Sequence, residues 1–581
     1  MLYQIIVEKR DYSVCSFQKI DEEKVEPPFE IDPFEEKLFH QDIFTVNINK
    51  KTIQIENSQT REKKDIAAIL LLSTNKTYGR NAKGKLLYKC TPNNTNLPSF
   101  LVPYEVKKIG FSKVSVNIYI TIQFQEWKSK HPIGIINQII GPVDVLPNFY
   151  EYQMYCKDLN YSLKKMNQYV LPLTKDGSIM REIIAKFPEL EDRTQSHCVF
   201  SIDPEGSMDF DDAFSIRELG EDKIQISIYI ANVTLWLEFL NLWEMMEDHR
   251  VSTVYLPDNK RPMLPSILSD NLCSLKAKEH RFALVLDITY CLLSRNVIET
   301  KLGNAVVCLD KNYVYEENSL LKNVDYLLLE KIVRQMSGNP QMKYMDTLND
   351  SHDIVAYLMI YTNHCCAYML MQKKQGIFRS IVSKSSEKMD NEKLKMMPEN
   401  VSKFIQMTTS FSGKYVDLSK ETNEENISHC ILKLDSYIHI TSPIRRLVDV
   451  LNMIQIQQQY DILELSPDAL DFYQKWTFKI DVINQQMKQI RIVQNECQLL
   501  DFFEKNCDLL NVSHKGYTYH QKRRDGDPLL TYQYTVYLPE LNLMTQLLSD
   551  EDIPEYSCNK FKLFVFHNED KMKKKIRIQK I

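Results

Sequence analysis

The chain has 581 residues, of which 44% are hydrophobic and 26% charged, and its formal net charge is -5 at pH 7. This length predicts about three or four domains, and the composition is typical of an ordinary globular protein. The small negative charge argues against a protein that coats nucleic acid by bulk charge, but it leaves room for a basic channel in an acidic enzyme.

The 13 cysteines and the first residues bear on the compartment. Because the cysteines have no C-x-x-C or zinc-finger spacing, we expect reduced thiols and a cytoplasmic location, with a nuclear one as the alternative. The N-terminus lacks a basic region followed by an apolar core, and no uncharged apolar run reaches membrane-spanning length. We therefore expect a soluble protein without a membrane segment.

Strand patterns dominate the first 150 residues. Residues 43–48 and 52–56 alternate around Asn49-Lys50-Lys51 and predict a hairpin, which we assign to an N-terminal extension or partial barrel over residues 1–60. Residues 61–150 predict a small antiparallel barrel, because turns marked by Asn, Gly and Pro separate four strand-like runs at 66–72, 85–90, 114–124 and 134–141.

Aromatic rings and positive charges are mixed along this predicted barrel. Oligonucleotide-binding barrels hold single strands by stacking and phosphate contact, so the mixture favours RNA or DNA binding, although any one ring is equally compatible with the core. The residues concerned are Tyr78, Arg80, Tyr88, Lys89, Phe100, Lys107 and Lys108.

An acidic run at 201–213, Ser-Ile-Asp-Pro-Glu-Gly-Ser-Met-Asp-Phe-Asp-Asp-Ala, places Asp203, Asp209, Asp211 and Asp212 within ten residues. An ordered cluster of carboxylates costs stability unless cations neutralise it, and hard oxygen ligands without interleaved Cys or His favour Mg2+ or Mn2+ over zinc. A solvated acidic turn is the simpler alternative. A calcium loop is disfavoured because the Asp-x-Asp-x-Asp-Gly pattern is absent.

Linking and helical segments surround this run. Residues 151–195 predict a linker with a helix at 178–187, and residues 224–233 an apolar strand. The proline-rich segment 250–265 predicts a rigid loop that presents Tyr255, unless that tyrosine is simply buried. Helical periodicity follows at 353–371.

The run at 437–446, Tyr-Ile-His-Ile-Thr-Ser-Pro-Ile-Arg-Arg, carries helix-start signals. Ser442 as N-cap and Pro443 at the first position predict a helix from here to about Tyr460. Arg445 and Arg446 would then lie in the first turn, where a cation opposes the helix dipole unless an anion is bound beside it. A salt-bridged surface pair is the alternative.

The C-terminal third predicts helices and then strands. Residues 468–505 form a long amphipathic stretch of one or two helices. Strand-like runs at 529–538, 541–547 and 561–566 predict a second barrel over residues 506–581, ending in a basic tail at 571–580.

Taken together, these runs resemble the ribonuclease II (RNB) family of 3'-to-5' exoribonucleases, which includes ribonuclease R and the exosome's catalytic subunit. The matching stretches are 201–216, 253–275 (with Tyr-Leu-Pro-Asp and Pro-Met-Leu-Pro) and 437–449. The resemblance implies a multidomain α+β protein, in which an RNB-type catalytic domain over residues 196–505 is flanked by small OB-like β-barrels. The N-terminal barrel would be cold-shock-like and the C-terminal barrel S1-like.

The resemblance also implies a function: hydrolysis of single-stranded RNA to 5'-mononucleotides from the 3' end, with Mg2+ or Mn2+ as cofactor and little sequence preference. Other RNA-degradation proteins are expected as partners of a monomer. The alternative is a catalytically weak or inactive RNA-binding scaffold. The implied metal ligands are Asp203, Asp209, Asp211 and Asp212, the implied catalytic residues Asp211, Arg445 and Tyr255, and the implied RNA contacts Tyr255, Tyr315, Arg445 and Arg446.

The chain departs from the family pattern at several positions. A His and an Asp of the family are replaced by Tyr229 and Asn232, and a Glu pair by Ala356 and Tyr357. Further departures stand at Leu447 and Met453. None removes an implied metal ligand, but together they bear on rate, processivity and the path of the RNA.

Overall fold

The computed structural model describes residues 2–20, 27–106, 115–174, 178–220, 222–247, 249–383, 393–394, 396–420, 427–523, 532–568 and 573–581. The chain divides into two compact units. One contains Met1–Asn160, Leu256–Asp258 and Ile492–Ile581, and the other contains Tyr161–Tyr255 and Asn259–Arg491.

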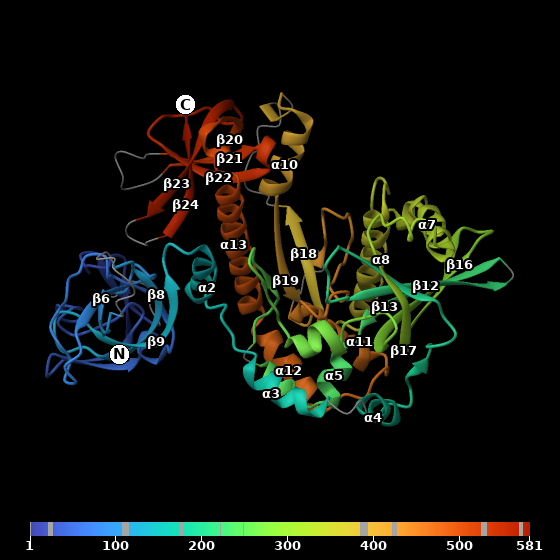
Figure 1. The fold of residues 1–581 in the computed structure, drawn as a ribbon, viewed down its shortest axis with the longest axis horizontal. Coiled ribbons are helices and arrows are strands. Elements are labelled where there is room, and N and C mark those ends of the chain that lie inside the picture. Colours follow the sequence, from blue (N-terminus) through green and yellow to red (C-terminus); the bar gives the residue numbers. More distant parts are fainter. Residues whose placement is uncertain are drawn as a thin grey trace. The chain divides into compact units, whose positions relative to one another are not determined.

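The N-terminal 160 residues form a four-stranded sheet and a closed barrel (Figure 1). The sheet has the order β2-β1-β3-β4, and the predicted hairpin is confirmed as its antiparallel pair β3–β4. The barrel has the order β5-β6-β7-β9-β8. The strands are β1 (Leu2–Val7), β2 (Cys15–Lys19), β3 (Ile43–Asn47), β4 (Thr52–Asn57), β5 (Ile66–Leu70), β6 (Leu87–Pro92), β7 (Phe100–Pro103), β8 (Ile118–Glu126) and β9 (Ile133–Pro142), with the short helix α1 (Gln59–Glu62) between β4 and β5.

One apolar cluster runs through both the sheet and the barrel, from Tyr3 to Trp127. It includes Tyr88 and Phe100, which are 8% and 0% exposed, so these two rings belong to the core and not to a binding surface. Tyr78 is 40% exposed and stays available as a platform. Lys107, Lys108 and Val114, which begins the predicted third strand, lie outside the described residues.

The C-terminal residues form a five-stranded antiparallel sheet of order β22-β21-β20-β23-β24, whose end strands β22 and β24 lie close together. Gly516 is required here, because a Cβ at this position would lie 2.6 Å from Leu538 Cδ2. The predicted basic tail is wrong: residues 573–580 pair with β23 along its length. The strands are β20 (Ser513–Arg523), β21 (Tyr532–Leu538), β22 (Leu543–Ser549), β23 (Cys558–Asn568) and β24 (Lys573–Lys580).

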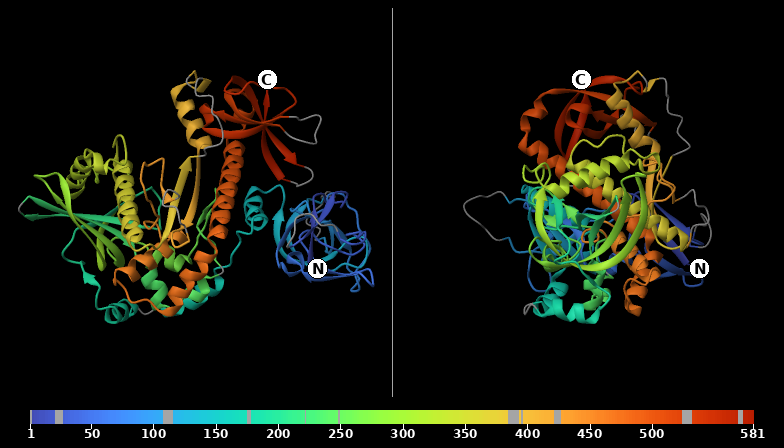
Figure 2. Two further views of the ribbon diagram at one scale, coloured as in Figure 1. Left: turned by 180° about the vertical axis from the view of Figure 1, so that it is seen from behind. Right: turned by 90° about the vertical axis from the view of Figure 1, so that its right-hand side faces the viewer.

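The second unit is built on a six-stranded sheet of order β10-β17-β11-β12-β13-β16. The long strand β17 pairs with β11 through its second half and with β16 through its first half, so the sheet curves back on itself (Figure 2). The strands are β10 (Glu191–Asp192), β11 (Val199–Asp203), β12 (Asp212–Gly220), β13 (Lys223–Ala231), β16 (His280–Cys291) and β17 (Asn296–Val314).

Two long helices, α7 (Val324–Ser337) and α8 (Ser351–Gln372), bury the apolar face of this sheet. By length and composition alone α8 could cross a membrane. It packs instead as a core helix, with Ile354, Leu358 and Leu370 fully buried in the cluster that contains the sheet. Apolar residues on several sides are typical of such a buried helix.

The remaining elements of the second unit surround the end of the sheet. The segment 467–505 forms two helices, α12 and α13, where one or two were predicted. The elements are α3 (Lys164–Leu173), α4 (Ile179–Lys186), α5 (Val233–Phe239), α6 (Trp243–Met246), the short pair β14 (Val254–Tyr255) and β15 (Lys260–Arg261), the hairpin β18 (Ile377–Ser383) and β19 (Phe411–Asp417), α10 (Glu399–Ser410), α11 (Leu447–Gln459), α12 (Pro467–Phe478) and α13 (Ile480–Lys505). The C-terminal part of α13, from Ile492, belongs to the first unit, which also contains α2 (Leu146–Cys156).

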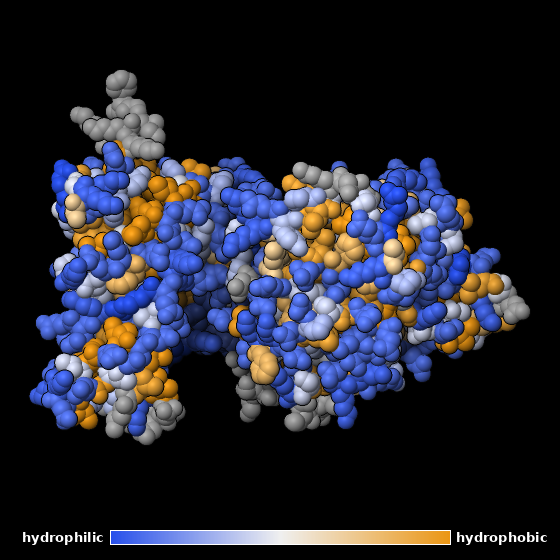
Figure 3. Space-filling model, turned by 90° about the horizontal axis from the view of Figure 1, so that it is seen from below, coloured by the Kyte–Doolittle hydropathy of each residue, from blue (hydrophilic) through white to orange (hydrophobic). Residues whose placement is uncertain are grey.

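The face shown in Figure 3 is mainly hydrophilic and carries separate apolar patches. Scattered exposed apolar side chains are normal for a folded protein, because polar atoms cannot cover its whole surface. All 13 cysteines are free thiols.

Candidate active site

The four aspartates of the acidic run lie at the meeting point of β11 and β12. Asp203 is the last residue of β11 and Asp212 the first of β12. The connecting loop turns at Gly206, whose φ of +80° favours glycine. These positions bring the carboxylates near enough for Asp203, Asp209 and Asp211 to repel one another, which raises the pKa of Asp203 beyond the effect of its burial.

Segment 274–275 holds the loop of the acidic run in place. The backbone N-H of Phe210 donates to Ser274 Oγ (3.0 Å), which in turn donates to the carbonyl of Met208 (2.8 Å). The backbone N-H of Leu275 donates to the carbonyl of Phe210 (3.0 Å). The Leu-Cys-Ser-Leu part of the second matching stretch therefore supports the shape of the first.

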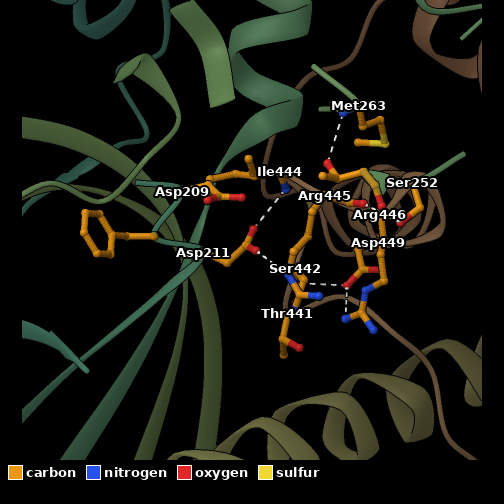
Figure 4. Close-up of polar contacts among 12 residues, drawn as sticks. Asp209, Asp211, Ser252, Met263, Thr441, Ser442, Ile444, Arg445, Arg446 and Asp449 are labelled. Carbon is orange, nitrogen blue, oxygen red and sulfur yellow. Dashed lines mark hydrogen bonds and ion pairs between the residues drawn. The ribbon is translucent and has the colours of Figure 1, made fainter. Parts of the chain in front are cut away.

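Asp211 is 4% exposed and both of its carboxylate oxygens are occupied (Figure 4). The backbone N-H of Ile444 donates to Oδ1 (3.0 Å), and Arg445 Nε donates to Oδ2 (3.1 Å). Burial raises the pKa of Asp211 to about 6, although Arg445 and the Ile444 N-H favour the charged form. Asp211 thus positions the arginine for which the family resemblance implies a role at the RNA.

Asp209 is held by a lysine that the sequence analysis did not single out. Lys260 Nζ lies 2.8 Å from Asp209 Oδ1 and 2.9 Å from Asp270 Oδ1, bridging the two carboxylates. Burial lowers the pKa of Lys260, but these two hydrogen bonds outweigh it and raise the pKa overall. The sequence could have indicated Lys260 as a site residue, because it lies in the proline-rich loop that also carries Tyr255.

Asp203 and Asp212 are the least neutralised members of the cluster. Burial, opposed by a hydrogen bond from Ser201 and reinforced by Asp211, raises the pKa of Asp203 to about 7. Burial and then Asp203 raise the pKa of Asp212 well above its usual range. Asp212 Oδ2 is buried and has no hydrogen-bond partner among the described residues. A buried, unpartnered carboxylate oxygen is costly, so it calls for a proton or a cation.

These residues fit one hard divalent cation, held by Asp203 and Asp212. The evidence is the donor chemistry and the orphaned Asp212 oxygen. The side chains as they stand do not form a closed site: in the described part of the chain, no group of three or more His, Cys, Asp or Glu is arranged to hold a metal ion. Asp209 and Asp211 are both paired with protein cations.

The helix predicted to begin at Ser442 begins later, because α11 starts at Leu447. Residues 443–446 form a turn, and Arg446 then pairs with Ser252 as an antiparallel bridge. The backbone N-H of Thr253 donates to the carbonyl of Arg445 (3.0 Å). Arg445 thus lies in the turn and Arg446 is the extended residue that precedes the helix, so neither arginine lies in the helix's first turn.

The two adjacent arginines point to different partners (Figure 4). Arg445 reaches Asp211, and its Nη2 also donates to Ser442 Oγ (2.8 Å). Arg446 Nη2 donates to Asp449 Oδ1 (2.9 Å), which also accepts the backbone N-H of Ser442 (2.7 Å). Arg445 therefore joins the aspartate site and Arg446 does not.

The two tyrosines of the predicted site, Tyr255 and Tyr315, have different surroundings. Tyr255 is 38% exposed on β14, and its hydroxyl donates weakly to Asp209 Oδ2 at 3.5 Å, so it is not a buried loop tyrosine. Tyr315 follows β17, and its ring stacks on His352 with centroids 3.5 Å apart. Burial, reinforced by Asp212, raises the pKa of Tyr315. His352 is a second ring near the site that the sequence analysis did not single out.

The residues at which the chain departs from the family pattern make contacts of their own in the core. Tyr229 shares a hydrogen bond with Ser215 (2.9 Å between oxygens), and Tyr357 donates to the carbonyl of Met342 (2.9 Å). Asn232 caps α5 and donates to Asn304 Oδ1 (2.9 Å). Leu447 and Met453 are buried on α11.

Comparison with known proteins agrees with this fold. The model of the RNB domain matches residues 191–326 and 321–461, which contain the sheet, the four aspartates and both arginines. Residues 191–461 of the chain therefore form an RNB domain.

Two curated relatives are bacterial ribonucleases R. That of Chlamydia pneumoniae is 24% identical over 383 residues, which are 55% of this chain and 56% of the relative. That of Aquifex aeolicus is 23% identical over 558 residues, which are 82% of this chain and 73% of the relative. The chain thus spans just over half of the first relative's length and about three quarters of the second's.

Two solved structures share the fold. Mycoplasma genitalium RNase R in complex with ribose methylated single-stranded RNA matches with a TM-score of 0.66 and 14% identity, covering 100% of both chains. Yeast Ssd1, described as a pseudonuclease, matches with a TM-score of 0.57 and 13% identity, covering 95% of this chain and 79% of Ssd1. The same fold therefore accompanies both a ribonuclease and a pseudonuclease.

Proposed function

We propose that this protein is a metal-dependent hydrolytic 3'-to-5' exoribonuclease that degrades single-stranded RNA to 5'-mononucleotides with little sequence preference. The observation that carries the proposal is the carboxylate cluster of buried Asp211 and half-buried Asp203 and Asp212, with Arg445 fixed on Asp211. Burial raises the pKa of all three carboxyls, Asp211 adds to the rise at Asp203, and Asp203 and Asp211 add to it at Asp212. Such a cluster lowers the stability of the fold and has no evident structural role. Metal-assisted phosphodiester hydrolysis requires carboxylates grouped in this way.

Asp203 and Asp212 would hold a divalent cation, with Mg2+ as the first candidate and Mn2+ as the second. Such a cation, when bound, supplies an activated water and stabilises the leaving 3'-oxygen. Asp209 and Asp211 are the remaining candidate ligands, each available only if its present cation partner, Lys260 or Arg445, moves.

Arg445 would stabilise charge on the phosphate. Its side chain is 41% exposed, and only its Nε and Nη2 have partners within the described residues. The guanidinium therefore keeps N-H groups for the phosphate oxygens as their charge grows. Tyr255, exposed and beside Asp209, would pack on the terminal nucleotide and set its register.

The test is degradation of a 5'-labelled single-stranded RNA with Mg2+ or with EDTA. The wild-type protein should shorten the RNA stepwise and release 5'-mononucleotides only with the metal. Asp212→Asn should lose this activity, because it removes the charge of the unpartnered carboxylate. The matched control is Glu218→Gln, an exposed acid on the same strand, which should remain active.

The second candidate function is an RNA-binding scaffold without catalysis. It is favoured by the ion pairs that occupy Asp209 and Asp211, and the likeness to Ssd1 shows that the fold occurs in a pseudonuclease. RNA binding without any metal-dependent release of mononucleotides would establish the scaffold and refute the exoribonuclease. We also propose a cytoplasmic location and a monomeric state.

A further inference from the structure

A second cluster of positive charge lines a pocket of about 610 Å³ in the second unit. The walls come from the hairpin β18–β19, from the first half of α13, and from the segment that ends at Arg446. None of the lining residues is acidic, whereas five are cationic: Arg379, Lys414, Arg446, Lys488 and Arg491.

Most of these cations have no counter-charge. Within the described residues, Arg379, Lys414, Lys488 and Arg491 form no ion pair, and Arg446 alone is bound to Asp449. Burial lowers the pKa of Arg379, and the nearby Arg491 and Arg446 lower it further, although Tyr415 opposes them. The Nε of Arg446 is buried without a partner. Guanidinium groups that repel one another in a partly buried place call for an anion.

The pocket is built by specific contacts. The guanidinium of Arg379 lies over the ring of Tyr415, 5.2 Å from its centroid. A Cβ at Gly413 would lie 2.5 Å from Arg379 Nη2, so a larger residue there would displace the guanidinium from its present position. Asn484 of α13 ties down the hairpin: its Oδ1 accepts the Tyr415 N-H (2.7 Å) and its Nδ2 donates to the Tyr415 carbonyl (2.9 Å).

The floor of the pocket is neutral. The hydroxyl of Tyr415 lies 2.8 Å from Nδ1 of His439. Burial, then Arg446 and Arg379, hold the pKa of His439 well below its usual range. The charge in the pocket therefore comes from arginines and lysines, and it persists throughout the neutral pH range.

The pocket is separate from the aspartate site but joined to it by one turn. Arg445 points to Asp211, whereas Arg446 lines the pocket. The turn at 443–446 thus carries one guanidinium to each site, so an anion bound beside Arg446 lies next to the backbone that positions Arg445.

We propose that this pocket binds the phosphate group of a nucleotide. Arginine forks match phosphate oxygens in pairs, and the volume lies in the range of small-ligand sites, about 300–1,000 Å³. Two sources supply this chemistry: an internal phosphodiester of the bound RNA, which rests on the proposed function, and the 5'-phosphate of a free mononucleotide, which does not.

The test compares a pocket variant, Arg379→Gln/Arg491→Gln, with a control variant, Lys322→Gln/Lys331→Gln. The control removes the same charge from exposed positions outside the pocket. Binding of a 5'-labelled single-stranded RNA is measured by fluorescence anisotropy at several salt concentrations in EDTA, and binding of 5'-AMP by calorimetry. Because no metal is present, neither readout depends on hydrolysis.

The two sources give different results. If the RNA backbone fills the pocket, the pocket variant binds RNA at least about tenfold more weakly, and its salt slope falls by about 0.7 for each phosphate that is no longer neutralised. If a free nucleotide fills it, the affinity for 5'-AMP falls by a similar factor while RNA binding matches the control.

The proposal is overturned if both affinities stay within about twofold of the control variant. Lys488→Gln is a second pocket variant that controls for misfolding. It removes a lining cation from the exposed face of α13 and leaves the hairpin unchanged. It should show the same loss to a smaller degree. If the wild-type protein hydrolyses no RNA with Mg2+ but the pocket variant still binds more weakly than the control variant in EDTA, the proposed function fails and the pocket proposal stands.

Discussion

Four carboxylates in one short run have four different environments. Asp209 is bound to Lys260 and Asp211 to Arg445, while Asp212 keeps a buried oxygen without a partner in the described part of the chain. Among the described residues, Ser201 alone donates to the carboxylate of Asp203, through its hydroxyl (2.7 Å). The arrangement leaves one end of the cluster ready for a cation and keeps the other end neutralised by the protein itself.

Lys260 competes with a metal for Asp209 if Asp209 is a ligand. Lys260→Met should therefore lower the Mg2+ concentration for half-maximal cleavage about fivefold, since a partly exposed ion pair contributes up to about 1 kcal/mol. Electron paramagnetic resonance measures Mn2+ binding without an activity assay and should show the same gain in metal affinity. The control is Lys311→Met, whose partner is Glu317 (2.7 Å). An unchanged metal requirement would remove Asp209 from the ligand set.

His429 makes the stability depend on pH. It is 7% exposed, and its Nδ1 accepts the backbone N-H of Leu432 (3.2 Å). Burial lowers the pKa of His429 to about 4. Because the unfolded pKa is about 6.5, the unfolded state binds more protons between these values, and stability is lost as pH falls through this window.

The expected loss is on the order of 1–2 kcal/mol at pH 5 relative to pH 8 for this one group. Urea unfolding of His429→Gln should show a smaller loss on the acid side than the wild type. His280→Gln, at an exposed histidine, should follow the wild-type curve. Parallel curves for His429→Gln and the wild type would show that this histidine does not titrate with folding.

At the scale of elements, backbone pairing decides where the arginines point. Ser442 and Pro443 carry helix-start signals, yet α11 begins at Leu447 because the preceding residues pair with the segment around Ser252. Local propensity is worth less than these tertiary hydrogen bonds. The result is a turn that ends at the extended Arg446, so that the successive side chains Arg445 and Arg446 make contacts at different sites.

A buried polar network joins three elements through Asn232. Its Oδ1 accepts from Thr234, from the backbone N-H of Leu235 and from Gln457 of α11, while its Nδ2 donates to Asn304 of β17. The family residue aspartate cannot make the donor contact and would bring a charge to a fully buried position.

Asn232→Asp should therefore lower the free energy of unfolding by roughly 1–3 kcal/mol in urea titrations. The matched control is Asn323→Asp at the N-cap of α7, where aspartate caps as well as asparagine, and the change should stay within about 0.5 kcal/mol. A neutral or stabilising effect of Asn232→Asp would mean that the network rearranges around the charge.

At the scale of the whole molecule, the N-terminal residues form a core of their own. The sheet and the closed barrel share one cluster, and Tyr119 stacks on Tyr152 of α2 with centroids 4.2 Å apart. The barrel therefore includes α2, and a clean truncation must remove all of residues 2–160. This piece carries Tyr78 and Arg80, the exposed ring and cation of the predicted binding surface.

Deletion of residues 2–160 should weaken binding of single-stranded RNA and make its salt dependence less steep, by about 0.7 in slope for each phosphate that the barrel would neutralise. Anisotropy titrations at several salt concentrations measure both. Full-length Arg80→Gln/Lys89→Gln should reproduce part of the effect. A truncated protein with the wild-type slope would assign the barrel no part in RNA binding.

The sequence by itself indicated the residues of the candidate site and predicted most of the elements. The acidic run, the proline-rich loop and the Ser-Pro-Ile-Arg-Arg segment are local patterns, and local patterns report residue type and periodicity. Such patterns predicted the central strand β13, the helix α8 and the RNB domain.

Only the tertiary structure decided how the charges are paired. Lys260 and Asp270 meet Asp209 across loops, Tyr88 and Phe100 turn into the core, and residues 573–580 become a strand because β23 offers them a partner. Ion pairs, burial and strand pairing depend on residues distant in the chain. For the same reason, the cationic pocket between the β18–β19 hairpin and α13 has no counterpart in any single stretch of sequence.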